Sequence, residues 1–214
     1  YIYPGDQPSS PSISTGTLGA DLEEVDGIYK INKIFTRLDW NPSFKAPLAE
    51  PGLNIVEGNY IVAVDGVPLS KEVNIYKLLE NKVGKQVVLK INSKPTIAGS
   101  RDVTVKPISY SNEIDLRRMD WVETNRKKVD KLSNGQIAYV YMPNTANEGY
   151  TNFNRYYFSQ MDKKALLMDE RNNGGGSVAD YVIDLLSREL IAGWGIRDGK
   201  SFTTPGNGIY GPKA

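Results

Sequence analysis

A run of three glycines, Gly174 to Gly176, is the feature of the sequence best suited to chemistry. It follows an apolar stretch, Leu166 to Met168, that predicts a buried strand, and it precedes a segment with helical spacing, SVADYVIDLLSREL. Glycines at such a junction let main-chain N–H groups point into open space beside a helix N-terminus, where an anion is stabilised. The loop is therefore an oxyanion site, a phosphate cradle, or only a place of close packing. The patterns G-x-G-x-x-G and G-x-x-x-x-G-K-[ST] are absent, which speaks against a nucleotide phosphate.

Two side chains next to this loop could also take part in chemistry. Ser177 follows the glycines, but the segment Gly-Gly-Ser-Val-Ala lacks the last glycine of the nucleophile pattern G-x-S-x-G. A serine just ahead of a helix more commonly caps it, and we expect Ser177 to be an N-cap. Arg171 could clamp a substrate carboxylate, or it could tie the loop to a neighbouring acid, which is the interpretation we favour.

The composition limits the function classes. The sequence contains no histidine and no cysteine, so these residues alone can form neither a Ser-His-Asp triad nor a thiol nucleophile nor a disulfide. The same absence leaves only carboxylates as zinc ligands and speaks against a zinc site, and we expect no metal or organic cofactor. A net charge of +1 gives no electrostatic reason to expect a nucleic acid or membrane partner.

A second candidate site lies in the segment Thr17-Leu18-Gly19-Ala20-Asp21, directly before a predicted strand. A short apolar loop with a glycine can offer N–H groups to the terminal carboxylate of a peptide, while the next strand edge pairs with the peptide main chain. We expect Leu18, Gly19 and Ala20 to form this loop, and Asn74 and Leu78 to belong to a helix that forms the other wall. An ordinary turn is the alternative interpretation.

The elements that must position these loops fall into two sets. Residues 1–16 are rich in Pro, Ser and Gly and predict a linker or the edge of a preceding domain. Residues 17–108 predict a small domain: a strand in GIYKINKIFT, a strand over Tyr60 to Val64 followed by an Asp65-Gly66 turn, a helix in SKEVNIYKLLENKVG with Ser70 as its N-cap, and strands in QVVLKINS and RDVTVKPI.

Residues 109–214 alternate helix and strand, which predicts a parallel or mixed α/β sheet. A charged amphipathic helix comes first, with an inner stripe of Leu116, Met119 and Val122 and a solvated face of Arg and Lys. Strands are predicted in QIAYVYMP and KALLMDE, helices in GYTNFNRYYFSQMD and SVADYVIDLLSREL, and a further strand is predicted to start in IYGPKA.

Two stretches resemble a known family. The segment APLAEPGLNIVEGNYIVAVDGVPL is similar to the signature of PDZ domains carried by bacterial-type proteases, with Asn59 where Asp is usual. The segments RRMDWVETNRKKVDKLSNGQIAYVYMPN and FNRYYFSQMDKKALLMDERNNGGGSVAD resemble the tricorn protease and its bacterial homologues within the tail-specific (S41) serine peptidases. The pattern D-x-R-x-N-G-G-G is present from Asp169 to Gly176.

The resemblance implies a fold and a set of site residues. It implies a PDZ-like, partly open β-barrel with helices over residues 17–108, followed over residues 109–214 by the N-terminal part of an α/β, crotonase-like serine protease domain. Gly175, or else Gly174, would supply an oxyanion N–H, and the loop at Leu18, Gly19 and Ala20 would bind peptide. The family's serine and histidine have no matching positions here, so we expect a central fragment that is inactive on its own.

The resemblance also implies partners and a compartment. The parent would be a serine-type peptidase that acts on peptides or unfolded polypeptide, forms a homo-oligomer and works in the cytoplasm, or in the periplasm or outside the cell if it carries a signal peptide. A non-catalytic PDZ-type scaffold is the main rival, and an α/β nucleotide-binding protein is a weaker one.

Overall fold

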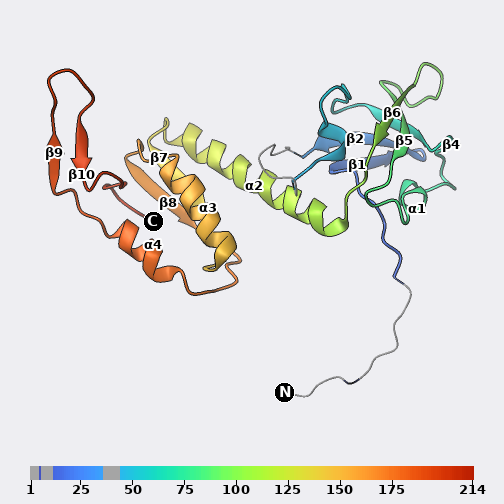
Figure 1. The fold of residues 1–214 in the computed structure, drawn as a ribbon. Helices are drawn as coiled ribbons and strands as arrows, with labels where there is room; N and C mark the ends of the chain where they lie inside the picture. Colours follow the sequence, from blue (N-terminus) through green and yellow to red (C-terminus); the bar gives the residue numbers. More distant parts are fainter. Residues whose placement is uncertain (1–4, 6–11, 36–43) are drawn as a thin grey trace. The chain divides into compact units, whose positions relative to one another are not determined.

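The computed structural model describes residues 5, 12–35 and 44–214, whose course Figure 1 shows. The chain divides into two compact units, residues 1–120 and residues 121–214. The division falls inside helix α2, Tyr110–Leu132, so the first half of this helix belongs to the first unit and the second half to the second. In the described part of the chain, no helix has the length and apolar character needed to cross a lipid bilayer.

The first unit is built on an antiparallel sheet with the strand order β1-β2-β3-β5-β6, and the short strand β4 pairs with β3. The strands are β1 (Ala20–Val25), β2 (Ile28–Ile34), β3 (Tyr60–Val64), β4 (Val67–Pro68), β5 (Val87–Asn92) and β6 (Arg101–Val105). Strands β1 and β6 are the two ends of the order, and among the described residues no pairing joins them. The sheet is therefore open, as expected for this fold class.

Two tight turns fix the register of the first hairpins. Asp65 and Gly66, between β3 and β4, have φ values of 48° and 81°, which are both left-handed and confirm the predicted turn. Asp26 and Gly27 repeat this geometry between β1 and β2, with φ values of 53° and 85°. The sequence analysis missed this second turn, and with it β1 as a separate strand.

Alternating apolar residues of the strands form the core of the first unit. Val87, Leu89 and Ile91 of β5 are buried at every second position, because successive side chains of a strand point to opposite faces. They pack with buried residues of the other strands, of the 3₁₀ helix Pro47–Ala49 and of helix α1, among them Leu18, Tyr29, Ile31, Leu48, Ile61, Val64, Ile75, Leu79, Val103 and Val105.

Helix α1, Ile75–Leu78, is much shorter than the helix predicted between Ser70 and Gly84. Asn74, not Ser70, is its N-cap, and the Asn74 Oδ1 accepts a hydrogen bond from the Tyr76 N–H at 2.8 Å. Asn81 has a φ of 55°, a left-handed conformation that prevents the helix from continuing. The long-helix prediction was wrong because asparagines, whose side chains compete for main-chain N–H groups, flank the apolar segment.

The end of α1 is also held by residues ahead of β1. The Gly16 N–H donates to the Leu79 carbonyl at 2.9 Å, and the Asn81 N–H donates to the Ser14 carbonyl at 2.7 Å. Residues 14–16, which belong to the segment expected to be a linker, therefore pair with the first unit. Residues 1–4 and 6–11 of that segment lie outside the described residues.

The second unit contains a parallel pair of strands, β7 (Ile137–Tyr141) and β8 (Ala165–Asp169), in register from Ile137↔Ala165 to Tyr141↔Asp169. Helix α3, Asn147–Phe158, connects them, which confirms the predicted strand–helix–strand order. Lys213 forms an isolated parallel bridge with Leu166, so the segment IYGPKA, in which a strand was predicted to start, pairs with β8 at a single residue.

Aromatic stacking within α3 and an amide contact at its end hold this helix against β7. Phe153 and Tyr157 are fully buried and stack with their ring centroids 4.9 Å apart. Gln160, just after α3, is 8% exposed, and its side-chain amide both accepts from the Tyr139 N–H at 3.2 Å and donates to the Tyr139 carbonyl at 3.0 Å. This exchange mimics a strand partner and fixes the end of α3 against β7.

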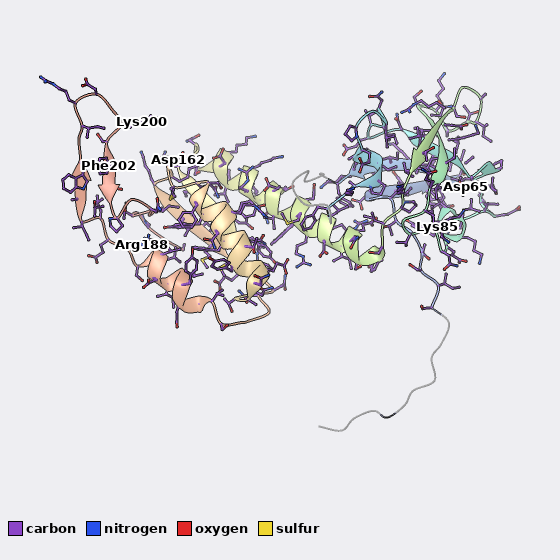
Figure 2. All side chains as sticks on the ribbon, in the orientation of Figure 1. Asp65, Lys85, Asp162, Arg188, Lys200 and Phe202 are labelled. Carbon is purple, nitrogen blue, oxygen red and sulfur yellow. The ribbon has the colours of Figure 1, made fainter. Side chains whose placement is uncertain are left out.

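The remaining elements are helix α4, Ala179–Leu186, and a hairpin of β9 (Ala192–Trp194) and β10 (Phe202–Thr204). Helix α4 is shorter than the segment SVADYVIDLLSREL predicted. The hairpin was not predicted, because its strands have three residues each and show no clear alternation. Trp194 and Phe202, the latter labelled in Figure 2, stack at 6.1 Å while more than half of each side chain is exposed.

The two left-handed turns allow a matched test of how the first unit is held together. A Cβ on Gly27 would lie 2.1 Å from the Lys71 nitrogen, whereas a Cβ on Gly66 would meet no atom within 4 Å. We expect Gly66→Ala to lower the free energy of unfolding by about 1 kcal/mol through backbone strain alone. Gly27→Ala adds a clash with main chain, and we expect a loss of about 2–4 kcal/mol.

Urea unfolding followed by far-UV circular dichroism measures both losses. Because the two glycines have nearly equal φ values, the difference between the variants isolates the steric contact with Lys71. Equal losses for the two variants would show that this contact does not constrain the hairpin.

Candidate functional site

The loop ahead of β1, residues 17–20, is buried and closely packed. Leu18 is 2% exposed and belongs to the core of the first unit. Gly19 has a φ of 67°, and a Cβ there would lie 3.1 Å from the Ala46 Cα, so both the conformation and the space require glycine. The Gly19 carbonyl accepts from the Phe35 N–H at 3.0 Å, which ties the loop to the end of β2.

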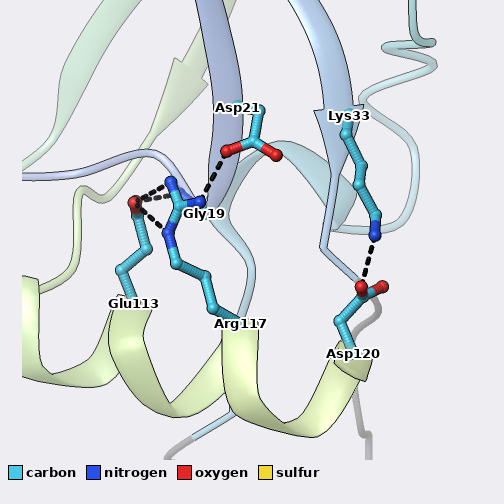
Figure 3. Close-up of polar contacts among 6 residues, drawn as sticks. All are labelled: Gly19, Asp21, Lys33, Glu113, Arg117 and Asp120. Carbon is cyan, nitrogen blue, oxygen red and sulfur yellow. Dashed lines mark hydrogen bonds and ion pairs between the residues drawn. The ribbon is translucent and has the colours of Figure 1, made fainter. Parts of the chain in front are cut away.

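The Gly19 N–H, which belongs to the loop of Leu18, Gly19 and Ala20 expected to bind a peptide carboxylate, already donates to a carboxylate of this chain. Its partner is Glu113 in the first turn of α2, whose Oε2 lies 3.1 Å away (Figure 3). The other oxygen of Glu113 accepts from the Arg117 guanidinium at 2.8 and 3.2 Å. Arg117 in turn pairs with Asp21 of β1 at 2.5 Å.

This network places one buried charge between two compensating groups. Glu113 is 6% exposed, and burying a carboxylate costs free energy unless hydrogen-bond donors and an opposite charge compensate it. The Gly19 N–H and Arg117 provide both. Arg117 also lies 4.5 Å above the ring of Phe35, so the face of this helix predicted to be solvated contacts the first unit at Arg117.

Two further contacts hold the first half of α2. Leu116 is fully buried against Phe35 and Ala46, which confirms its predicted place in the inner stripe of the helix. Asp120 pairs with Lys33 of β2 (Figure 3). Polar contacts at Glu113 and Asp120 thus flank an apolar contact at Leu116, all of them within residues 1–120.

The residues predicted for the other wall of the peptide site have structural contacts. Asn74 caps α1, and Leu78 is partly buried against the core. Between them in sequence lies Tyr76, which is half exposed. Burial, followed by the negative charge of Glu113, raises the pKa of Tyr76. The Tyr76 hydroxyl is therefore affected by the charge of the Gly19–Glu113–Arg117 network.

Strand β1 is the part of this region that stays open. It pairs with β2 on one side, and within the described residues no strand pairs with its other edge. The last three residues of β1, Glu23 to Val25, are exposed. An extended peptide that adds to a sheet binds to an edge of this kind.

The glycine loop of the second unit follows β8, and two of its glycines have positive φ values that residues with a side chain rarely adopt. Gly175 has a φ of 82°, and a Cβ there would meet no atom within 4 Å, so this residue faces open space. Gly176 has a φ of 145°, and a Cβ there would lie 2.1 Å from the Thr145 carbonyl oxygen. The third glycine therefore permits close packing against Thr145, in the chain after β7, while the second leaves open space around its Cα.

The two predicted oxyanion donors both have internal acceptors. The Gly174 N–H donates to the Pro143 carbonyl at 2.9 Å. The Gly175 N–H donates to the side-chain Oδ1 of Asn173 at 2.8 Å. The Nδ2 of Asn173 is buried and has no hydrogen-bond partner in the part of the chain that the structure describes. Gly175 is thus restrained by a side chain, and Gly174 by the main chain.

A buried acid anchors the start of this loop. Asp169, at the end of β8, is 8% exposed and accepts from Tyr139 Oη at 2.6 Å and from the Arg171 guanidinium at 2.6 and 2.9 Å. The hydrogen bonds from Arg171, partly opposed by burial, lower the pKa of Asp169 to about 2. Arg171 therefore binds the neighbouring acid as predicted, and its guanidinium lies 4.7 Å above the ring of Trp121.

Ser177 does not cap α4. The N-cap position belongs to Val178, with no capping bond from a side chain, so the prediction for Ser177 was wrong. The Val178 N–H donates instead to the Thr145 carbonyl at 2.8 Å, which replaces the cap by a contact with the chain after β7. In residues 5, 12–35 and 44–214, no group of three acidic side chains is placed to hold a metal ion.

Sequence analysis missed Glu113, Arg117, Tyr76 and Asn173 as residues of these sites. The spacing of Glu113 and Arg117, four residues apart on a predicted helix, is a signal for an ion pair, but it does not reveal a partner 94 residues away. Asn173 was recognised only as part of the pattern D-x-R-x-N-G-G-G; its place two residues before Gly175, where an asparagine side chain can bond the main chain, is the signal for its contact.

Comparison with known proteins gives consistent results for both units. A family model described as the tricorn protease PDZ domain matches residues 16–110. Tricorn protease from Thermoplasma volcanium is 29% identical over 92% of this chain, which covers 19% of that protein. A tricorn protease homologue from Saccharolobus solfataricus is 31% identical over 96% of this chain, which covers 18% of it.

A solved structure agrees with these sequence relatives. A crystal structure of the tricorn protease matches 94% of this chain with a TM-score of 0.82 and 27% identity, and the chain covers 19% of it. The chain thus spans about a fifth of the length of the proteins that it matches.

The low pKa of Asp169 predicts how the second unit responds to acid. Because the pKa in the folded protein lies below the ordinary value of 3.8, ionised Asp169 stabilises the fold above about pH 4, by about 2 kcal/mol. This contribution is lost as the pH falls from about 4 through 2. We expect Asp169→Asn to lower the free energy of unfolding by about 2 kcal/mol at pH 7 and by much less at pH 2.

Urea unfolding at a series of pH values measures this difference. Asp162→Asn is the control, because Asp162 is an exposed acid between α3 and β8, labelled in Figure 2, and its loss should change stability by less than about 0.5 kcal/mol. A pH-independent difference between Asp169→Asn and the unaltered chain would contradict the assigned pKa.

Proposed function

We propose that the chain forms the peptide-docking and oxyanion-loop part of a serine-type peptidase. The premise is that residues 16–110 match the tricorn protease PDZ domain and that nearly the whole chain is related to tricorn proteases. The parent protein would hydrolyse amide bonds of peptides or unfolded polypeptide through an acyl-enzyme intermediate. The observation that carries the proposal is the open space at Gly175, at the carboxyl end of the parallel strand β8.

Gly175 is the oxyanion donor in this proposal. When a serine oxygen attacks the scissile carbonyl carbon, the carbonyl oxygen becomes negatively charged, and one fixed N–H donor at that oxygen is worth about 2.7–4 kcal/mol in the transition state. The Asn173 carboxamide must rotate away for the Gly175 N–H to serve this oxygen. Gly174 is the weaker candidate, because its N–H is bound to the Pro143 carbonyl.

The groups that attack the substrate would come from outside residues 1–214. Proton transfer from a serine hydroxyl needs a base, and these residues contain no histidine. The role of the second unit is then to present the glycine loop at the end of β8, where Asp169 and Arg171 hold its first residues. The mechanism requires no metal or organic cofactor.

The first unit would dock the polypeptide before cleavage. The open edge of β1 supplies main-chain donors and acceptors, the loop at Leu18, Gly19 and Ala20 closes one end of the site, and Asn74 and Leu78 lie on the helix expected to form the other wall. Main-chain pairing gives affinity with little dependence on sequence, which suits a protein that feeds varied polypeptides to a protease.

A non-catalytic peptide-binding scaffold is the second candidate function. The observation that favours it is that the N–H groups of Gly174 and Gly175 both have internal acceptors. In a scaffold the glycine loop would only allow the close approach of Gly176 to Thr145.

The oxyanion assignment predicts the effect of removing one N–H in the full-length parent. Gly175→Pro deletes the donor, and we expect kcat to fall at least about 10²-fold. Gly175→Ala keeps the N–H and introduces strain at a φ of 82°, so it should lower kcat by less than about tenfold. Steady-state kinetics on a peptide substrate, with circular dichroism of both variants to verify folding, measures the ratio. Equal kcat values for folded proline and alanine variants would rule out Gly175 as the donor.

The absence of an imidazole predicts the behaviour of residues 1–214 alone. They should hydrolyse no peptide and should not be labelled by a fluorophosphonate probe, because no imidazole is present to activate a serine. The full-length parent should be labelled at a single serine. Labelling of residues 1–214 would contradict the division of catalytic groups, and an unlabelled, well-folded parent would favour the scaffold.

A further inference from the structure

We propose that Glu113 occupies the position of a peptide's terminal carboxylate in the first unit, so that the site accepts extended internal segments of a polypeptide and excludes free C-termini. The inference deepens the peptide-docking part of the proposed function and rests on it. It starts from the hydrogen bond between the Gly19 N–H and Glu113 Oε2, which joins the expected carboxylate donor to a carboxylate of the chain itself.

The geometry at Glu113 is that of a complete carboxylate site. One oxygen accepts from the Gly19 N–H at 3.1 Å, and the other accepts from Arg117 Nη2 at 2.8 Å and Nε at 3.2 Å. A main-chain donor combined with a guanidinium is the set of groups that recognises a peptide's terminal carboxylate. In Figure 3 both donors converge on the Glu113 side chain, so its oxygens fill the site.

A second carboxylate cannot enter while Glu113 is present. Two carboxylates at one N–H repel each other, and one of them would have to take up a proton. Glu113 could leave only by breaking its buried bond to Gly19 and its partly buried bonds to Arg117. Packing opposes this, because the neighbouring Leu116 is fully buried, and Arg117 is itself held by Asp21.

The rest of the site remains available to a peptide without a free end. From Leu22 to Val25, the outer edge of β1 has no paired strand among the described residues. Pairing with this edge uses the peptide main chain and needs no terminal charge. The occupant favoured by the structure is therefore an extended internal segment that lies beyond the closed end of the site.

Binding of two degenerate decapeptide pools to ¹⁵N-labelled residues 1–214 tests the inference. The pools are identical and N-acetylated, and one has free carboxyl ends while the other is amidated. For the unaltered chain we expect apparent affinities within about twofold of each other, shifts at the amides of Leu22 to Val25, and no shift at the Gly19 amide. A free-carboxyl pool that binds at least tenfold more tightly and moves the Gly19 amide would overturn the inference.

For the Glu113→Ala variant we expect the result opposite to that of the unaltered chain, namely a preference for free carboxyl ends. The substitution frees the Gly19 N–H and Arg117, so we expect the free-carboxyl pool to bind at least about tenfold more tightly than the amidated pool, with a shift of the Gly19 amide. The matched control is Asp115→Ala, which removes an acid of the same helix that pairs with Arg118. In this variant the apparent affinities of the two pools should stay within about twofold of each other. A folded Glu113→Ala chain without carboxylate preference would overturn the inference.

Glu113→Gln keeps an acceptor for Gly19 without the charge and covers the case in which Glu113→Ala fails to fold. Its amide still fills the site, so we expect no tenfold preference for free carboxyl ends, and such a preference would count against the inference. If neither pool moves any amide of β1 in any folded variant, the docking proposal itself fails. A carboxylate preference in the unaltered chain would leave docking standing and remove only the role of Glu113.

Discussion

Both candidate sites of this protein depend on the acceptor to which a glycine N–H of the loop donates its hydrogen bond. An unpaired donor costs free energy once it is shielded from water, so a loop built to present donors needs a partner for them when no ligand is bound. In the first unit the partner of Gly19 is the Glu113 carboxylate, and in the second the partner of Gly175 is the Asn173 carboxamide. Any ligand of these loops therefore competes with a side chain of the protein.

The two partners differ in how firmly they are held. Glu113 is buried, charged and bound to Arg117, so its removal leaves a guanidinium without its main acceptor. Asn173 is neutral, and its Nδ2 has no hydrogen-bond partner among the described residues, so a rotation of the carboxamide gives up a single hydrogen bond. The donor of the first loop is accordingly held by a buried, charged partner, whereas the donor of the second is held by a single hydrogen bond to a neutral side chain. This contrast is consistent with the proposed docking of internal peptide segments in the first unit and with the proposed oxyanion role of the glycine loop in the second.

Much of the fold follows from local sequence patterns, and the errors have identifiable physical causes. Apolar alternation predicted β5 and β6, and the Asp65-Gly66 pair predicted its turn, because these signals depend on neighbouring residues. Helix α1 is shorter than predicted because Asn74 and Asn81 limit it at its two ends. Strand β1 was missed because its sequence, ADLEEV, contains three acidic residues. The pattern D-x-R-x-N-G-G-G identified the loop after β8, and the Asp169–Arg171 contact within it was foreseeable at a separation of two residues. The Gly19–Glu113 contact was not foreseeable, because it joins residues 94 positions apart.

The contact between Trp121 and Arg171 has a practical consequence for work on the second unit. The indole ring lies against the guanidinium on one side and edge-on to Tyr141, 5.2 Å away, so its emission depends on whether Arg171 keeps its place at Asp169. Arg171 is also only three residues ahead of the glycine run. Because the chain also contains Trp40 and Trp194, a variant that keeps Trp121 as its single tryptophan would be needed for fluorescence to report a movement of Arg171 without any added label.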